Sequence, residues 1–129
     1  SFSGDPIELE LISRIDTEGN AENVNMTSDG VFVSCDDAGA CFIPIESFLD
    51  SGSSYRFAED LTVDHIALKG DIACLSLGSK GIALYDISDP RQPEERGIFP
   101  IGYAYRSIFW EDKLLVCTRE GIQVVSIEK

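Results

Sequence analysis

Short apolar runs repeat along this chain with a period of about 40 residues. The clearest unit is "GIALYDISDPRQPE" (81–94), and weaker copies begin at Gly39 ("GACFIPIESF") and Gly121 ("GIQVVSIEK"). The starting glycines of the three units are 42 and 40 residues apart. A period of about 40–45 residues built from short apolar runs is typical of β-propeller blades. The repeat therefore predicts an all-β fold of three four-stranded antiparallel blades.

Each unit shows the same order of pieces: an apolar strand, a tight turn, a second strand, a polar loop ending in glycine, and a third strand. The predicted first strands are 22–28, 63–69 and 105–110. The runs are apolar almost throughout, as expected of strands covered on both faces. The best helical fragment is a single turn within 45–52.

A fourth, outer strand follows the third one in two of the units. It is predicted at 53–61 in blade one and at 94–99 in blade two, where charge and proline suit an edge strand. No such strand follows blade three. The segment "DPIELELISRID" (5–16), in which apolar residues alternate with glutamates, is interpreted as the outer strand that is missing there.

The chain is accordingly divided as one propeller segment, 1–129, in which the N-terminal strand is followed by three blades. Their expected bounds are 22–61, 63–99 and 105–129. Known propellers use about four or more blades, so three blades do not close a ring. Two arrangements remain open: a homodimer that completes a six-bladed ring, or a fragment of a larger propeller.

The string "GIALYDISDPRQPEERG" resembles the repeat of the LVIVD family of β-propellers. Matching positions are Gly81, Leu84, Asp86, Ser88, Asp89, Pro90 and Pro93. The resemblance implies a propeller, often found in bacterial and archaeal surface or secreted proteins, and implies no particular activity. Asp86 and Asp89 are expected to accept hydrogen bonds from backbone N–H groups of the turn.

The chain is strongly acidic. It has 10 basic and 23 acidic residues, which gives a net charge of −13. Such a surface repels phosphate backbones and anionic lipids, so nucleic-acid binding is not expected. No apolar run reaches the roughly 18 residues that a membrane span needs, and "SFSGDPIELE" lacks the pattern of a signal peptide.

Four cysteines leave the redox compartment open. Cys74 and Cys117 lie inside apolar runs, where free cysteine behaves as a small hydrophobe. Cys35 and Cys41 bracket a short polar loop and could face each other across a hairpin. Both a disulfide and a free thiol pair are compatible with that spacing.

Acidic residues and the single histidine supply the first group of candidate binding residues. Asp36 and Asp37 precede Asp64 and His65, which begin the next inner strand. Carboxylates in one place can hold a cation, but their spacing is not that of a calcium loop, and Cys35-x5-Cys41 lacks zinc-ligand spacing. No metal, cofactor or catalytic residue is predicted. His65 is a candidate for ligand contact in the central channel.

Aromatic and arginine side chains supply the second group. The segment "GYAYRSIFW" (102–110) holds Tyr103, Tyr105 and Arg106, residue types enriched in binding hot spots. Arg119 lies in the loop "TREG" (118–121), expected on the same face. Asn25-Met26-Thr27 matches a glycosylation acceptor, but its predicted place inside a strand argues for a chance match.

The leading interpretation is a non-enzymatic interaction module that presents loops on a propeller face to a protein partner. The acidic loops favour a basic or cationic partner. Two alternatives remain: a carbohydrate-binding propeller that uses Tyr103 and Tyr105, and an enzyme or metal site in the channel.

Overall fold

The fold is built from β-strands. The computed structural model describes residues 4–50 and 52–128, and within them it contains eleven strands and one short 3-10 turn, η1 (Ile45–Ser47). The strands form three antiparallel sheets of four, four and three strands. This confirms the all-β prediction and the expected turn near residue 45. Residue 51 of that predicted turn and residue 129 of the third unit lie outside the described residues.

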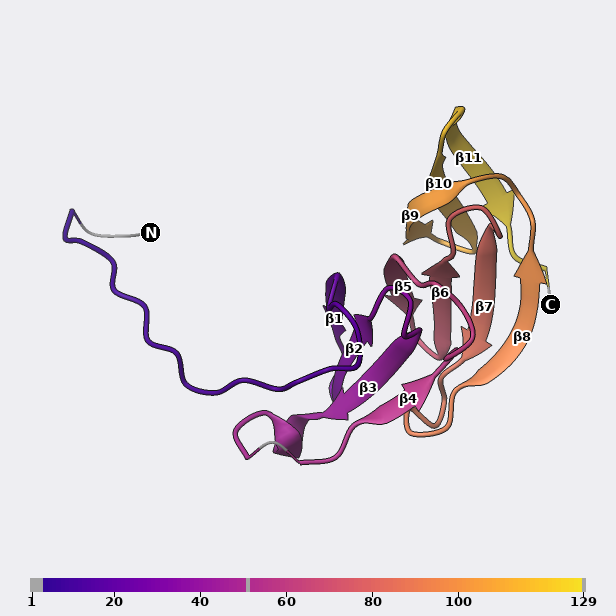
Figure 1. Cartoon of the computed structure of the whole chain (residues 1–129). Helices are drawn as coiled ribbons and strands as arrows, with labels where there is room; N and C mark the ends of the chain where they lie inside the picture. Colours follow the sequence, from indigo (N-terminus) through magenta and orange to yellow (C-terminus); the bar gives the residue numbers. More distant parts are fainter. Residues whose placement is uncertain (1–3, 51, 129) are drawn as a thin grey trace.

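Each sheet is a meander of consecutive strands. Sheet one contains β1 (Asn23–Met26), β2 (Gly30–Ser34), β3 (Ala40–Pro44) and β4 (Tyr55–Phe57). Sheet two contains β5 (His65–Lys69), β6 (Ile72–Ser76), β7 (Ile82–Asp86) and β8 (Glu94–Phe99). Sheet three contains β9 (Ala104–Trp110), β10 (Lys113–Thr118) and β11 (Gly121–Ser126). The sheets follow one another as an open stack that does not close into a ring (Figure 1).

The repeated glycines have the same structural reason in sheets one and two. Gly39 and Gly81 each precede the third strand with φ of 83° and 90°, a conformation that side chains disfavour. A Cβ at Gly39 would collide with the carbonyl of Ala58, and one at Gly81 would collide with the carbonyl of Phe99. Glycine is therefore required at both positions because the chain turns there beside the outer strand.

The turn after β7 is fixed by aspartate side chains, as expected. The N–H of Ser88 donates to Asp86 Oδ1 at 2.8 Å, and the N–H of Arg91 donates to Asp89 Oδ1 at 3.1 Å. The hydrogen bond from Ser88 lowers the pKa of Asp86 below its ordinary value. These motif residues shape the backbone of the turn.

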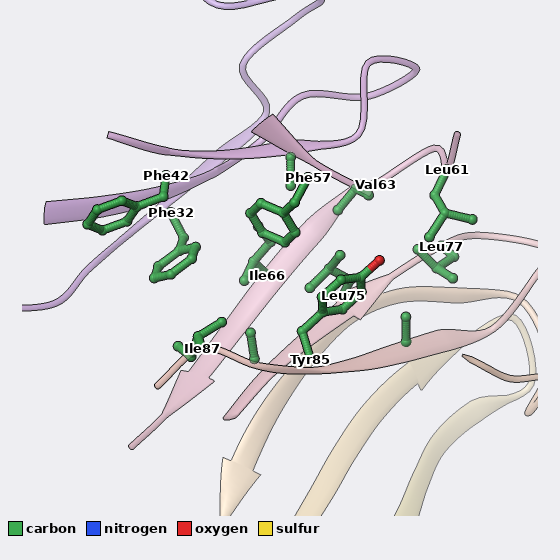
Figure 2. Close-up of a cluster of buried hydrophobic side chains, with 13 residues drawn as sticks. Phe32, Phe42, Phe57, Leu61, Val63, Ile66, Leu75, Leu77, Tyr85 and Ile87 are labelled. Carbon is green, nitrogen blue, oxygen red and sulfur yellow. The ribbon is translucent and has the colours of Figure 1, made fainter. Parts of the chain in front are cut away.

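The largest core lies between sheets one and two (Figure 2). Sheet one contributes three phenylalanines, of which Phe32 lies 5.0 Å from Phe42 and 5.9 Å from Phe57 between ring centroids. Sheet two contributes residues that include Ile66 and Tyr85, and the ring centroid of Tyr85 lies 5.3 Å from that of Phe57. Such edge contacts add to the burial of apolar area that holds two sheets face to face.

Two smaller cores lie on the other faces. One joins sheets two and three and includes Cys74, Ile82, Leu114 and Val116. The other lies on the free face of sheet one, where Val33, Cys35, Cys41 and Ile43 pack with Ile15 of the N-terminal segment. Sheet two is therefore covered on both faces, while sheets one and three are each covered by a neighbouring sheet on one face.

The three predicted outer strands agree with the structure to different degrees. Residues 94–99 form β8 as expected, but in the unit 53–61 only Tyr55–Phe57 is a strand, because Ala58 turns away with φ of 52°. Among the described residues, the segment 5–16 forms no strand. Ile15 packs on sheet one, and the residues before it lead away from the sheets (Figure 1). A strand needs a neighbouring edge to bond with, and no strand edge in the described part of the chain pairs with this segment. Its pairing outside the chain stays a prediction.

Within residues 4–50 and 52–128, no helix has the length and apolar character needed to cross a bilayer.

Candidate functional site

Main-chain bridges between sheets bring the candidate loops to one end of the stack. Asp36 and Val63 exchange two backbone hydrogen bonds of 3.1 and 3.0 Å, and Gly78 and Ala104 exchange two of 3.0 Å. Each bridge joins the loop before a third strand to the start of the next sheet. The loops around residues 36, 64, 78, 103 and 119 therefore share one end, which we call the loop face.

Tyr103, Tyr105 and Arg119 form a stacked cluster on the loop face. Ala104 is fully buried, so the alternation of strand β9 turns Tyr103 and Tyr105 to the opposite side together. Their ring centroids lie 5.1 Å apart at 48°. The guanidinium carbon of Arg119 lies 3.9 Å from the centroid of Tyr103, and its Nε donates to the Tyr105 hydroxyl at 3.3 Å.

The contacts of this cluster stabilise the protonated form of Arg119. The hydrogen bond to Tyr105 raises the pKa of Arg119 above its ordinary value. A guanidinium stacked on one ring and bonded to the next fixes the orientation of both tyrosines. The two tyrosines are therefore held in one arrangement by contacts within sheet three, while Tyr105 remains 42% exposed.

A carboxylate lies beside the tyrosines. A Cβ on Gly78 would lie 3.3 Å from the Tyr103 hydroxyl and 3.6 Å from Asp64 Oδ2, so Gly78 is flanked by both groups. Burial raises the pKa of Asp64, and the carboxylates of Asp36 and Glu22 raise it further. Arg106 offsets part of this effect. The loop face thus concentrates negative charge next to the aromatic cluster.

His65 lies deeper, between the first strands of the sheets. It lines a groove with Asn25 of β1 and Ser107 of β9. Burial and the charge of Arg106 lower the pKa of His65, so the imidazole is neutral at pH 7. Its Nδ1 is buried and has no hydrogen-bond partner among the described residues. A central channel needs a closed ring, which the three sheets do not form, so the channel-facing position of His65 stays a prediction.

The two loop aspartates contact the start of sheet two, Asp36 through its main chain and Asp37 through its side chain. Asp36 adopts a φ of 54° and bridges to Val63 through its main chain, while Asp37 Oδ1 accepts a hydrogen bond from Thr62 Oγ1 at 3.3 Å. In the described part of the chain, no group of three or more His, Cys, Asp and Glu side chains is placed to hold a metal ion. Asp36 nevertheless lies close enough to Asp64 to affect its pKa.

The cysteine pair is brought together without a bond. Cys35 Sγ and Cys41 Sγ lie 3.9 Å apart and both are free, whereas a disulfide needs about 2.05 Å. The contact between the two thiols lowers the pKa of Cys35 and raises that of Cys41. Of the two arrangements that the spacing left open, the structure contains the thiol pair.

Asparagines of β1 form a link that the sequence did not reveal. Asn23 Oδ1 accepts from the N–H of Ile66 at 3.0 Å, and Asn25 Nδ2 donates to the carbonyl of Ile66. The side-chain amide of Asn25 is therefore engaged between sheets one and two. This placement supports the interpretation of the glycosylation pattern at 25–27 as a chance match.

Comparison with known proteins adds no assignment. No protein-family model matches the sequence, and no curated protein matches it significantly. The function is therefore argued from the site.

Proposed function

We propose that this chain is a non-enzymatic binding module, a part of a β-propeller whose loop face binds a basic segment of a protein partner. The observation that carries the proposal is the ordered cluster of Tyr103, Tyr105 and Arg119 beside the carboxylate of Asp64. Tyrosine and arginine are the side chains most often found at binding hot spots, and a preordered cluster lowers the entropic cost of binding.

Charge favours a cationic partner. Burial raises the pKa of Asp64, and the neighbouring carboxylates of Asp36 and Glu22 raise it further, so the ionised form of Asp64 is disfavoured at this place. A lysine or arginine of a partner would relieve this repulsion and bind by charge complementarity. The net charge of −13 adds long-range attraction for such a segment.

A carbohydrate ligand is the alternative, and the stacking geometry disfavours it. Sugars bind aromatic side chains through an open ring face. Arg119 lies 3.9 Å above the ring of Tyr103 and covers one face of it. A sugar would therefore have to displace this arginine or use Tyr105, the more open ring.

Titration calorimetry with an oligolysine peptide tests the proposal. We expect binding that weakens with added salt, with a loss of about fivefold for Asp64→Asn, the size of one exposed ion pair. Tyr105→Ala should lose about tenfold if the tyrosine is a hot spot. Glu94→Gln is the charge-matched control, because Glu94 lies at the opposite end of sheet two.

The outcomes separate the two ligand classes. Equal affinity in wild type, Asp64→Asn and Tyr105→Ala would reject a binding role for the loop face towards basic peptides. Binding of wild type to a glycan array, lost in Tyr105→Ala, would replace the proposal by the carbohydrate alternative.

A further inference from the structure

Two main-chain bridges join neighbouring sheets, and sheet three has a residue at the equivalent position that takes part in no such bridge among the described residues. Asp36 pairs with Val63 and Gly78 pairs with Ala104. In sheet three, the residue at the position of Asp36 and Gly78 is Arg119. It lies two residues after Cys117, which pairs with Ile122 across the hairpin, as Gly78 lies two residues after Ser76, which pairs with Ile82. No sheet follows sheet three in the described chain, so the main chain of Arg119 has no bridge of this kind.

The matching half of the bridge lies at the start of sheet one. The N–H of Glu22 bonds to the carbonyl of Ser34, as the N–H of Asp64 bonds to that of Ser76. Ala21, which precedes Glu22, therefore occupies the position that Val63 occupies before Asp64. Ala21 is exposed and takes part in no bridge among the described residues.

Apolar side chains at equivalent register positions are buried in the middle of the stack of sheets and exposed to solvent at its two ends. Ile122 pairs across the hairpin with Cys117 as Ile82 pairs with Ser76, yet Ile122 is 67% exposed and Ile82 is 3% exposed. At the other end of the stack, Val24 of β1 is 62% exposed. Each end of the stack thus exposes an apolar sheet face, whereas both faces of sheet two are buried against neighbouring sheets.

The N-terminal segment holds the position of an outer strand. Ile15 lies six residues before Ala21, as Phe57 lies six residues before Val63. Phe57 of an outer strand packs on Tyr85 of the following sheet, and Ile15 packs in the cluster that contains Ile43, the counterpart of Tyr85 in β3.

The remainder of that segment has no strand beside it. Residues 7–11 alternate apolar and acidic side chains, and Leu9 is 95% exposed. Within residues 4–50 and 52–128, sheet three has no outer strand, and the edge of β11 is free to pair with a segment of this kind. The two lie at opposite ends of the open stack and do not meet within one chain (Figure 1).

We propose that two copies of this chain associate head to tail, the free face of sheet one of each packing on the free face of sheet three of the other. Segment 5–16 of each copy pairs with β11 of the other, and Arg119 bridges to Ala21 across the interface. Each element that one end lacks among the described residues is present at the other end, and this complementarity favours a second copy as the occupant. Six sheets then close a ring, within the range known for propellers.

The mass in solution, measured by light scattering after gel filtration, tests the association. Wild type is expected at twice the mass of one chain, with the dimer strengthened by salt because both copies carry −13. Val124→Lys, on the bare face of sheet three, should give a folded monomer by circular dichroism. Ile98→Lys, an exposed position on the outer strand of sheet two, is the control and should remain dimeric.

Other masses contradict the proposal. A wild-type monomer would show that the faces are not joined in this way, and an open polymer would show that two copies do not close. A dimer that persists in Val124→Lys would place the interface elsewhere.

A disulfide trap tests the register, whatever the loop face binds. In a Cys117→Ser background, Ala21→Cys combined with Arg119→Cys should oxidise to a covalent dimer, because residues that exchange two backbone hydrogen bonds lie about 5.5 Å apart between Cα atoms. Each single variant is the control and should not form this product. A non-covalent dimer without the covalent product would overturn the bridge between Arg119 and Ala21.

Discussion

Arg119 lies over the ring of Tyr103, with its guanidinium carbon 3.9 Å from the ring centroid. The two residues are joined by the register of one hairpin, because Thr118 of β10 pairs with Ala104 of β9. The stack is therefore a consequence of how sheet three folds. This relationship makes the loop face a preformed surface.

Replacing Gly81 by alanine should destabilise the fold strongly. The new Cβ meets the carbonyl of Phe99, and φ is 90°, so strain and overpacking add to about 3 kcal/mol. Gly70→Ala is the matched control, since Gly70 has a φ of 56° but open space around it, and it should cost about 1 kcal/mol. Urea unfolding of both variants measures the difference, and equal losses would contradict a role for the close approach.

The phenylalanine cluster between sheets one and two should dominate stability. Phe32 is fully buried and contacts two other phenylalanine rings, so Phe32→Ala should cost about 3–5 kcal/mol. Phe99→Ala is the control. Because Phe99 is 42% exposed, this substitution should lower the free energy of unfolding clearly less. A comparable loss in both variants, measured by chemical denaturation, would show that the interface between these sheets is not the main core.

Asp64 should make stability depend on pH. Its pKa is raised in the folded state, so the folded protein binds this proton more tightly than the unfolded chain. The stability linked to this proton is therefore fully present below the pKa of the unfolded chain and is lost as the pH rises through the folded pKa, where the carboxylate is ionised among like charges. Asp64→Asn should raise the melting temperature at pH 7 and leave it unchanged at pH 3.

Thermal melts at the two pH values check this, with Glu94→Gln as the control for loss of one exposed carboxylate. A gain of equal size at both pH values would mean that the ionised carboxylate is not the cause.

Cysteine alkylation should report the association of two copies. Cys35, Cys41 and Cys74 are buried, and burial raises the pKa of Cys74 to about 11, so all three should react only on unfolding. Cys117 is exposed in the single chain but lies on the face of sheet three that the second copy would cover. Mass spectrometry should find it slow to react in wild type and fast in Val124→Lys. Equal rates in both proteins would leave Cys117 outside any interface.

Much of the strand pattern could be predicted because it rests on local sequence. The outer strand at 94–99 was predicted with its observed bounds, and the glycines at 39 and 81 mark turns whose geometry excludes side chains. The segment 5–16 has an equally clear alternation, but a strand also needs a neighbouring edge, and alternation says nothing about where that edge is. The same limit applies to any pairing between distant segments.

The candidate site was predicted as separate residues and not as an arrangement. Tyr103, Tyr105 and Arg119 were each expected on one face, but their stacking depends on the register of β9 and β10. The place of Gly78 between Tyr103 and Asp64 depends on a bridge between two sheets. Such contacts arise from tertiary structure, which spacing along the chain does not encode.

The most direct test of the binding proposal is to map the contact surface by NMR. Oligolysine added to the isotope-labelled protein should shift the backbone amide signals of Asp64, Gly78, Tyr103 and Tyr105 in a saturable way, while the signal of Glu94, at the other end of sheet two, stays in place. Shifts spread evenly over both ends of the sheets, or confined to the end that carries Glu94, would contradict a binding role for the loop face.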